Sequence, residues 1–242
     1  MDRCNVKKIQ VLIEKGKELP LATQHYPSRG QTAIQKLYLT PKGKFFLKKT
    51  SKQNHIDCQV EINSGSIAQR EYWAYCLAEK LKLNVPCLWL IDPMTSVQVW
   101  LDYPDARQYS TFQGKLVFKP ENIFDCALFD WLTGQVDRHD ANYLYNYVVQ
   151  DIILIDSAHC FLKYTGSIPD YLKYFEGSFE SELAVVRKTS TQSILSKISE
   201  KEVLKLVPLK LEEERSALVN RLKQLREVQT IQEIIQLYRR AR

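Results

Sequence analysis

The chain has 242 residues, enough for one two-part domain or two small ones. Its hydrophobic fraction of 45% and charged fraction of 26% are ordinary for a globular protein, which excludes fibrous and low-complexity classes. The net charge of +6 is too small to indicate nucleic-acid binding, although it suits an acidic ligand or an anionic surface.

The first part of the chain is predicted to form a small sheet. Residues 5–19 fit either a strand or a short helix, up to a proline. Four later runs have the pattern of strands: 33–39, 44–49, 87–91 and 97–100. The first two flank Thr40-Pro-Lys-Gly43, which suits a type I turn, and the last two flank a turn at 92–96. Leu101–Asp105 then ends the strand pattern, because its proline cannot continue a hydrogen-bonded ladder.

Helices are predicted next to this sheet and after it. Residues 69–81 are rich in helix formers and apolar on most of their circumference, and Glu71 is expected in the first turn. Residues 106–119 are predicted as loop. A helix begins at Pro120 and ends at Thr133-Gly-Gln, since apolar residues recur between them at helical spacing. After a segment of broken periodicity, three more helices are predicted: 199–206, which opens with a capping box, 211–225 and 231–238.

The most informative stretch is the polar loop that follows the helix from Pro120. It contains Asp137 and Asn142 five positions apart, and a predicted hairpin of the runs 143–149 and 151–155 leads from it to Asp156. This is the order of parts in the catalytic loop of kinases and the metal-binding Asp after it. One carboxylate orients or deprotonates an attacking hydroxyl, while an amide oxygen and a second carboxylate hold the magnesium that bridges the ATP phosphates.

The same residues carry a resemblance to a known family. Asp137-Arg-His and Asn142 match the D-R-H-x-x-N loop of the phosphatidylinositol 3-/4-kinases and their bacterial HipA-like relatives. The D-F-G-H motif of the lipid kinases is represented by Asp156-Ser-Ala-His159, which keeps the Asp and the His but loses the Phe and the Gly. The motifs of the resemblance cover roughly residues 28–162. The later helices are only generically compatible with it.

The resemblance implies an α+β, two-lobed, protein-kinase-like fold and one catalytic domain. A small β-rich N-lobe with one helix is expected over residues 1–101 and a mainly helical C-lobe over 102–242. ATP and Mg²⁺ are the implied cofactors. The implied catalytic residues are Asp137, Arg138 and His139, the metal ligands are Asn142 and Asp156, and the nucleotide-binding residues are Lys48, Glu71, Ser28, Gly30, Asp102 and Tyr103.

Alternatives remain for several of these residues. Lys48 ends a hydrophobic run, the form of the kinase strand whose Lys reaches the α- and β-phosphates, and Glu71 is its expected partner, with Glu79 as the fallback. The segment around Ser28 and Gly30 is either a phosphate-covering loop or an ordinary one. Asp102 and Tyr103 lie in the expected hinge, where backbone amides would meet adenine, or in a plain connection. His139 either acts near the transferring phosphate or braces its loop.

The acceptor also remains open. The HipA-like resemblance suggests Ser or Thr of a protein, and the lipid-kinase resemblance suggests a phosphoinositide, with a small molecule as a further option. The small size and the lack of a strongly basic interfacial helix favour the protein. Two other functions stay possible: a nucleotide-binding pseudokinase that serves as an interaction module, and an enzyme that transfers AMP. Peripheral membrane contact through the basic tail at Arg239–Arg242 is a further option.

Composition also bears on the compartment. The six cysteines are scattered and form no C-x-x-C pair, as is typical of thiols in a reducing environment. No apolar run approaches the roughly 20 residues that cross a bilayer, and the first residues lack the apolar core of a secretory signal. We therefore expect a cytoplasmic protein with no transmembrane segment and no nucleic-acid partner. Delivery as a secreted effector stays open.

Overall fold

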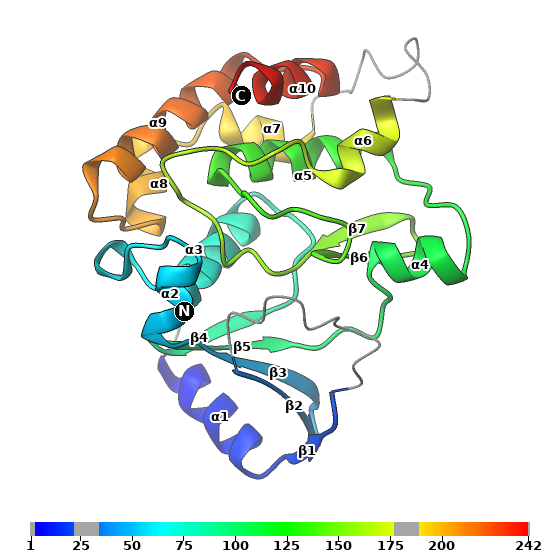
Figure 1. Cartoon of the computed structure of the whole chain (residues 1–242), viewed down its shortest axis with the longest axis vertical. Helices are drawn as coiled ribbons and strands as arrows, with labels where there is room; N and C mark the ends of the chain where they lie inside the picture. The colour runs from blue at the N-terminus through cyan, green and yellow to red at the C-terminus, as the bar shows by residue number, and fades with distance from the viewer. Residues whose placement is uncertain (1–2, 22–33, 177–188, 242) are drawn as a thin grey trace.

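The computed structural model describes residues 3–21, 34–176 and 189–241, and its elements fall into two parts (Figure 1). A five-stranded antiparallel sheet lies at one end, most of the helices gather at the other, and a two-stranded hairpin lies between them. The chain builds the sheet first and the helical part afterwards. The expected α+β class, β-rich at first and mainly helical later, is confirmed.

The strands of the sheet follow the predicted runs. They are β1 (Lys17–Leu19), β2 (Ile34–Thr40), β3 (Gly43–Lys49), β4 (Leu88–Asp92) and β5 (Thr95–Val99), in the spatial order β1-β2-β3-β5-β4. A tight turn joins β2 to β3, with Thr40 opposite Gly43. Gly43 has a φ of 113°, which glycine adopts without steric cost. The turn between β4 and β5 is shorter than predicted, so Ser96 belongs to a strand rather than to the turn.

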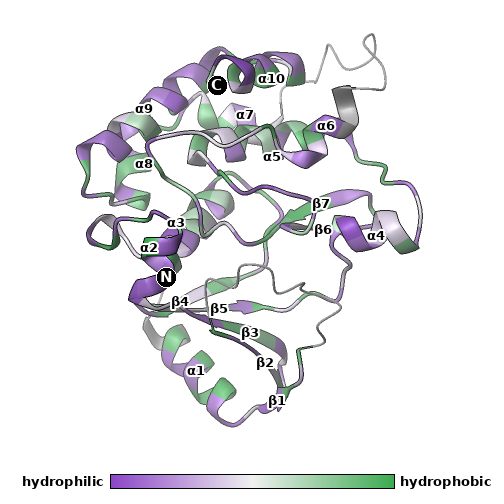
Figure 2. Cartoon of the chain, in the orientation of Figure 1, coloured by the Kyte–Doolittle hydropathy of each residue, from purple (hydrophilic) through white to green (hydrophobic). Residues whose placement is uncertain are grey.

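Helices accompany the sheet on both sides. In the described residues these are α1 (Arg3–Glu14), α2 (Lys52–Asp57) and α3 (Ile67–Lys80), with a 3-10 turn at Ile62–Ser64. Residues 5–19, left open between strand and helix, contain both α1 and β1. Figure 2 shows mixed apolar and hydrophilic residues along α1, and Ile9 and Ile13 of this helix pack in one cluster with Phe45 and Val97 of the sheet. This part therefore holds two helices beyond the one expected.

The helix α3 lies between the sheet and the later helices (Figure 1). It begins earlier than predicted because Ser66 caps it: Ser66 Oγ accepts from the backbone of Gln69, and Gln69 Oε1 accepts from the backbone of Ser66. His55 Nε2 accepts the backbone N–H of Ile67 at 3.0 Å and holds the same end of the helix. Glu71, predicted in the first turn, therefore lies in the second and is buried.

The middle of the chain differs from the prediction at one point. Residues 106–119 were expected as loop, but they contain α4 (Ala106–Phe112), because the Asp105 carboxylate caps this helix by accepting from Gln108 N at 2.8 Å. The next helix, α5 (Pro120–Thr133), has the predicted bounds and ends at Gly134, whose φ of 59° is left-handed. The predicted hairpin is present as β6 (Tyr143–Asn146) and β7 (Asp151–Leu154), with strands shorter than expected.

The remaining helices pack around α5. They are α6 (Asp170–Glu176), α7 (Ser190–Leu195), α8 (Glu200–Leu206), α9 (Glu212–Glu227) and α10 (Ile231–Arg240). The capping box at Ser199 and the last three helices are as predicted. Buried side chains of α5, α9 and α10 form the main hydrophobic core, which includes Leu128, Leu222 and Ile234. Within the described ranges, no helix combines the length and the apolar character that crossing a bilayer requires.

Candidate active site

Three side chains from distant elements meet where the sheet faces the β6–β7 hairpin. Lys48 Nζ on β3 lies 2.6 Å from Oε1 of Glu71 on α3 and 3.0 Å from Oδ1 of Asp156, just after β7. Ser96 Oγ on β5 donates to the other oxygen of Glu71 at 2.9 Å. The expected pairing of Lys48 with Glu71 is therefore present. The fallback partner, Glu79, is exposed on another face of α3.

The charges in this triad support one another. Burial alone would lower the pKa of Lys48, but the charges of Asp156 and Glu71 outweigh it and raise that pKa above its ordinary value. Burial would likewise raise the pKa of the Asp156 carboxyl, and Lys48, aided by His159, lowers it instead. Lys48 is thus held as a cation and Asp156 as an anion.

Strand alternation decides which of two adjacent lysines enters the site. Neighbouring side chains of a strand point to opposite faces. The Lys48 side chain is 11% exposed, and its Nζ lies 5.9 Å from the ring centroid of Phe46, two positions away on the same face. Lys49 is exposed on the other face. Composition alone does not distinguish the two lysines, but the alternation of side chains along β3 does.

The loop after α5 presents a half-exposed carboxylate. The Asp137 side chain is 48% exposed, with His139 Nε2 at 3.7 Å and His159 Nδ1 at 4.0 Å from its oxygens. Its backbone is fixed on both sides, because its N–H donates to Gln135 Oε1 at 3.1 Å and its carbonyl accepts from Asn142 Nδ2 at 2.7 Å. The carboxylate is therefore accessible to a substrate while the loop that carries it is held in place.

Arg138 braces this loop from the interior. Its guanidinium bonds to the Asp130 carboxylate at 3.0 Å and donates to the backbone carbonyls of Asn142 at 2.6 Å and Ile155 at 2.5 Å. Tyr171 donates its hydroxyl to the same Asp130 at 2.7 Å. Burial would lower the pKa of Arg138, and the charge of Asp130 raises it above the ordinary value. One buried cation thus fastens the loop to the strand end that carries the next carboxylate.

The donor set at the strand end fits a hard cation. Ile155 N donates to the carbonyl of Asn142 at 3.4 Å, so Asn142 lies opposite the residue that precedes Asp156. Asn142 commits its Nδ2 to Asp137, and within the described residues no hydrogen bond to its Oδ1 is found. A free amide oxygen beside a carboxylate suits Mg²⁺, which takes oxygen ligands and keeps several waters. No group of three or more His, Cys, Asp or Glu suited to a metal occurs in the part of the chain that the structure describes.

A cavity of about 560 Å³ opens beside the linker that leads from β5 to α4, which is in the usual range for ligand pockets. Its lining comes from β1 and the residues after it, β2, β3, the linker and α4: Leu19, Pro20, Leu21, Leu37, Lys44, Trp100, Leu101, Asp102, Tyr103, Pro104, Gln108, Phe112 and Gln113. Asp102 accepts from Lys44 Nζ at 2.7 Å. Within the described residues, the backbone of 101–103 makes no hydrogen bond. Both predicted hinge residues, Asp102 and Tyr103, therefore line a cavity with backbone groups to offer.

Two of the predicted site residues cannot be placed. Ser28 and Gly30, expected to cover the phosphates, fall outside the described residues. The other predicted site residues divide into two places: the linker cavity with Asp102 and Tyr103, and the cluster around Lys48.

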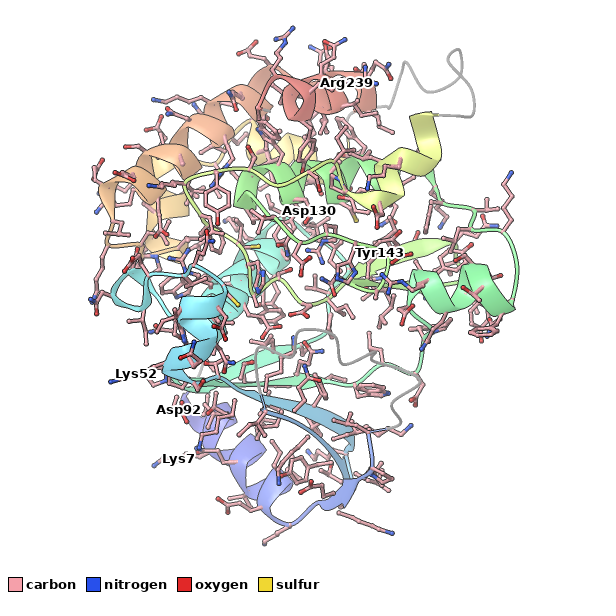
Figure 3. All side chains as sticks on the ribbon, viewed as in Figure 1. Lys7, Lys52, Asp92, Asp130, Tyr143 and Arg239 are labelled. Atoms are coloured by element: carbon pink, nitrogen blue, oxygen red, sulfur yellow. The ribbon has the colours of Figure 1, made fainter. Side chains whose placement is uncertain are left out.

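Several residues that support the site lie outside the motifs of the sequence. Asp130 is one of them, and Figure 3 shows it in the interior while the labelled Lys7 and Arg239 lie at the periphery. A carboxylate near the end of an otherwise apolar helix was an available signal, because a buried charge needs a partner. Ser96 could have been found from the register, since it lies opposite Lys48 in the sheet. Gln135, which also donates to the carbonyl of Asp156 at 3.2 Å, carried no local signal.

No protein-family model and no curated protein matches the chain. Among solved structures, the Helicobacter pylori proinflammatory kinase CtkA is 13% identical, with a TM-score of 0.44 and 93% of each chain covered. The Rio2 kinase of Chaetomium thermophilum, in its complex with ADP, Mg²⁺ and phosphoaspartate, is 14% identical, with a TM-score of 0.45, and the match covers 90% of this chain and 75% of that one. The pseudokinase domain of BIR2, an immune regulator of the RLK/Pelle family, is 11% identical, with a TM-score of 0.33 and coverages of 92% and 85%. These likenesses are distant.

Proposed function

We propose that the protein is an ATP- and magnesium-dependent phosphotransferase that moves the γ-phosphoryl group to a hydroxyl, with Ser or Thr of a protein as the acceptor. The observation that carries the proposal is the bonding of Lys48 to both Glu71 and Asp156, which lie 23 and 108 positions away in the sequence. Beside this triad, a loop presents an accessible carboxylate on Asp137 and a free amide oxygen on Asn142. Phosphoryl transfer requires a cation at the phosphates, oxygen ligands for the metal and a carboxylate near the attacking hydroxyl.

The nucleotide would lie along β3. Lys44 at the linker cavity and Lys48 share one face of this strand and lie roughly 13 Å apart along it. An adenine ring in the cavity, hydrogen-bonded to the backbone of 101–103, would direct the phosphates toward the ammonium of Lys48. The expected division into an N-lobe over 1–101 and a C-lobe over 102–242 is supported by the place of this linker, which joins the sheet to the helical part.

Each residue near the phosphates has a role that its contacts support. Bound Mg²⁺ supplies charge neutralisation, and Asn142 and Asp156 would hold it. Lys48 offers its ammonium to the phosphate oxygens while Glu71 keeps it in place. Asp137 accepts a hydrogen bond from the acceptor hydroxyl and orients it. His139 Nδ1 accepts the backbone N–H of Ala141 at 3.2 Å, which supports the bracing role for this ring.

Intact-mass spectrometry after incubation with Mg²⁺ and ATP tests the proposal. The wild-type protein should add a phosphoryl group to itself or to a protein acceptor. Asp156→Asn should lose this transfer and still unfold in a cooperative transition, because the metal ligand loses its charge without a change in volume. Asp151→Asn is the matched control and should keep transfer, since the one ion pair of the Asp151 side chain found among the described residues is with Lys119, at 3.4 Å.

The other results of this experiment are equally informative. Turnover like the wild type in Asp156→Asn would end the kinase proposal. A mass gain of one AMP would assign AMP transfer instead. No mass gain on any protein or lipid acceptor, together with nucleotide binding, would assign a pseudokinase that serves as an interaction module.

A further inference from the structure

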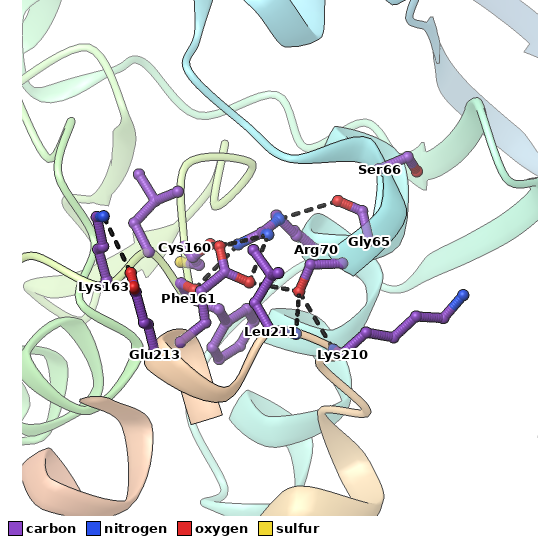
Figure 4. Close-up of polar contacts among 12 residues, drawn as sticks. Gly65, Ser66, Arg70, Cys160, Phe161, Lys163, Lys210, Leu211 and Glu213 are labelled. Atoms are coloured by element: carbon purple, nitrogen blue, oxygen red, sulfur yellow. Dashed lines mark hydrogen bonds and ion pairs between the residues drawn. The ribbon is translucent and has the colours of Figure 1, made fainter. Parts of the chain in front are cut away.

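The residue before Glu71 makes an ion pair across the molecule. Arg70 is fully buried on α3, and its Nη2 donates to both carboxylate oxygens of Glu214 on α9, at 2.8 and 2.9 Å. Its Nε donates to the carbonyl of Gly65 at 3.0 Å, at the start of the helix (Figure 4). This side chain therefore joins the helix that carries Glu71 to a helix near the other end of the chain.

The Glu214 side of the pair is also fixed. Ser64 Oγ donates to the Glu214 carboxylate at 2.5 Å. The same hydroxyl accepts the backbone N–H groups of Lys210 and Leu211, at 3.2 and 3.1 Å (Figure 4). The start of α9 is thus bonded through the Ser64 hydroxyl to the turn that precedes α3.

Arg70 also reaches the segment that follows the metal-binding strand. Its Nη1 donates to the carbonyls of Cys160 at 3.1 Å and Phe161 at 3.0 Å, four and five positions after Asp156 (Figure 4). One guanidinium therefore holds three segments together: α3, α9 and the chain that leaves the site. A planar guanidinium does this well, because its donors lie in a fixed fork.

We propose that the Arg70–Glu214 pair is a positioning device for the nucleotide site, an inference that rests on the function proposed above. Consecutive residues of a helix point about 100° apart, so Arg70 can face α9 while Glu71 faces the sheet. A rigid helix fixed through Arg70 sets the depth and rotation at which Glu71 meets Lys48. A buried ion pair is suited to this task, since its geometry is directional, whereas replacement of such pairs by apolar groups often leaves folding intact.

The double substitution Arg70→Met with Glu214→Leu tests this role, because it removes both charges and fills the space with apolar groups. We expect a cooperative unfolding transition to persist while the KM for ATP rises roughly tenfold, within the range typical of coupled sites. The matched control is Lys163→Met with Glu213→Gln, one position away on α9, where the ion pair is 63% and 72% exposed. That control should leave both kcat and KM unchanged.

A double-mutant cycle separates positioning from a general loss of structure. In the Glu71→Gln background, the Arg70→Met/Glu214→Leu substitution should add no further rise in KM, because it acts through Glu71. Effects that multiply in full would overturn the proposal. If the double variant does not fold, Arg70→Lys, which keeps the charge and loses the fork, should raise the KM for ATP in the same way.

Hydrogen exchange of α3 without nucleotide supplies a readout that needs no catalysis. Amides of residues 67–80 should exchange faster in Arg70→Met/Glu214→Leu than in the wild type or the control pair. Unchanged exchange would overturn the proposal, as would faster exchange with an unchanged KM. A wild-type protein that transfers nothing would refute the proposed function instead, and the exchange result would still show whether the pair fixes α3.

Discussion

At the scale of single residues, the site depends on an ammonium group that joins three elements. Lys48 contacts carboxylates on α3 and after β7, and its neighbour Lys49 contacts neither. The two lysines are adjacent in the sequence, but their side chains lie on opposite faces of the sheet. They form a natural pair of test and control.

Lys48→Met should lower kcat/KM for ATP much more than Lys49→Met. A lost hydrogen bond to a charged group is worth about 1.5–3 kcal/mol, which is a factor of roughly 10–150. Steady-state rates with varied ATP measure the difference, after thermal unfolding has established that both variants are folded. Equal effects would show that neither lysine holds the phosphates. A larger effect at Lys49 would show that the face of β3 that carries Lys49 lies in the site.

Asp137→Asn should lower turnover by about 10²–10⁴-fold and leave ATP binding nearly unchanged, because the substitution keeps the shape and removes the proton acceptor. His139→Ala should have a smaller effect, since its ring is bonded to the loop through Ala141 N. A magnesium-dependent thermal shift with ATP checks that both variants are folded. Full activity in Asp137→Asn with loss in His139→Ala would reverse the roles assigned to these two residues.

At the scale of elements, α5 carries a carboxyl group that the proposed chemistry does not use. Burial raises the pKa of Asp125 to about 6, and the nearby hydroxyls of Thr189 and Thr191 compensate only in part. Its Oδ1 is buried without a hydrogen-bond partner within the described residues. The buried charge of Asp125 therefore destabilises the contact between α5 and the start of α7.

Asp125→Asn should stabilise the protein at pH 7 by on the order of 1 kcal/mol, because it removes the cost of the buried charge. A raised carboxyl pKa gives stability that is fully present below the unfolded value of 3.8 and is lost as the pH rises through about 6. The wild type should thus lose stability relative to Asp125→Asn between these pH values. Thermal unfolding across that window measures it, and parallel curves would contradict the assignment.

The predictability of an element depended on its length and its caps. The helices α5, α9 and α10 show several turns of apolar periodicity, and they were predicted with nearly the observed bounds. The seven-residue helix α8 was predicted from its capping box instead. The short helices α2, α4, α6 and α7 have six or seven residues, too few for a periodicity to be read. Helices of this length are stabilised by caps and tertiary contacts rather than by propensity.

At the scale of the whole molecule, the prediction succeeded for residues in motifs and failed for their supports. The pairing of Lys48 with Glu71 was predicted from the family resemblance, and the two side chains lie 2.6 Å apart. The bond from Lys48 to Asp156 was not predicted. Their roles with ATP and Mg²⁺ stay predictions. Arg70 and Glu214 lie 144 positions apart, so no local pattern could pair them.

The separation of Arg70 and Glu214 in the sequence sets an order of events during synthesis. Arg70 is synthesised 144 residues before Glu214. At about 5–20 residues per second, the two are separated by roughly 7–29 s. During this interval the nascent chain already carries the sheet, α3 and, later, Asp137 and Asp156. The helix that aligns Glu71 is nevertheless not yet fastened. On the ribosome, the proposed phosphate site should therefore be complete only after α9 has emerged.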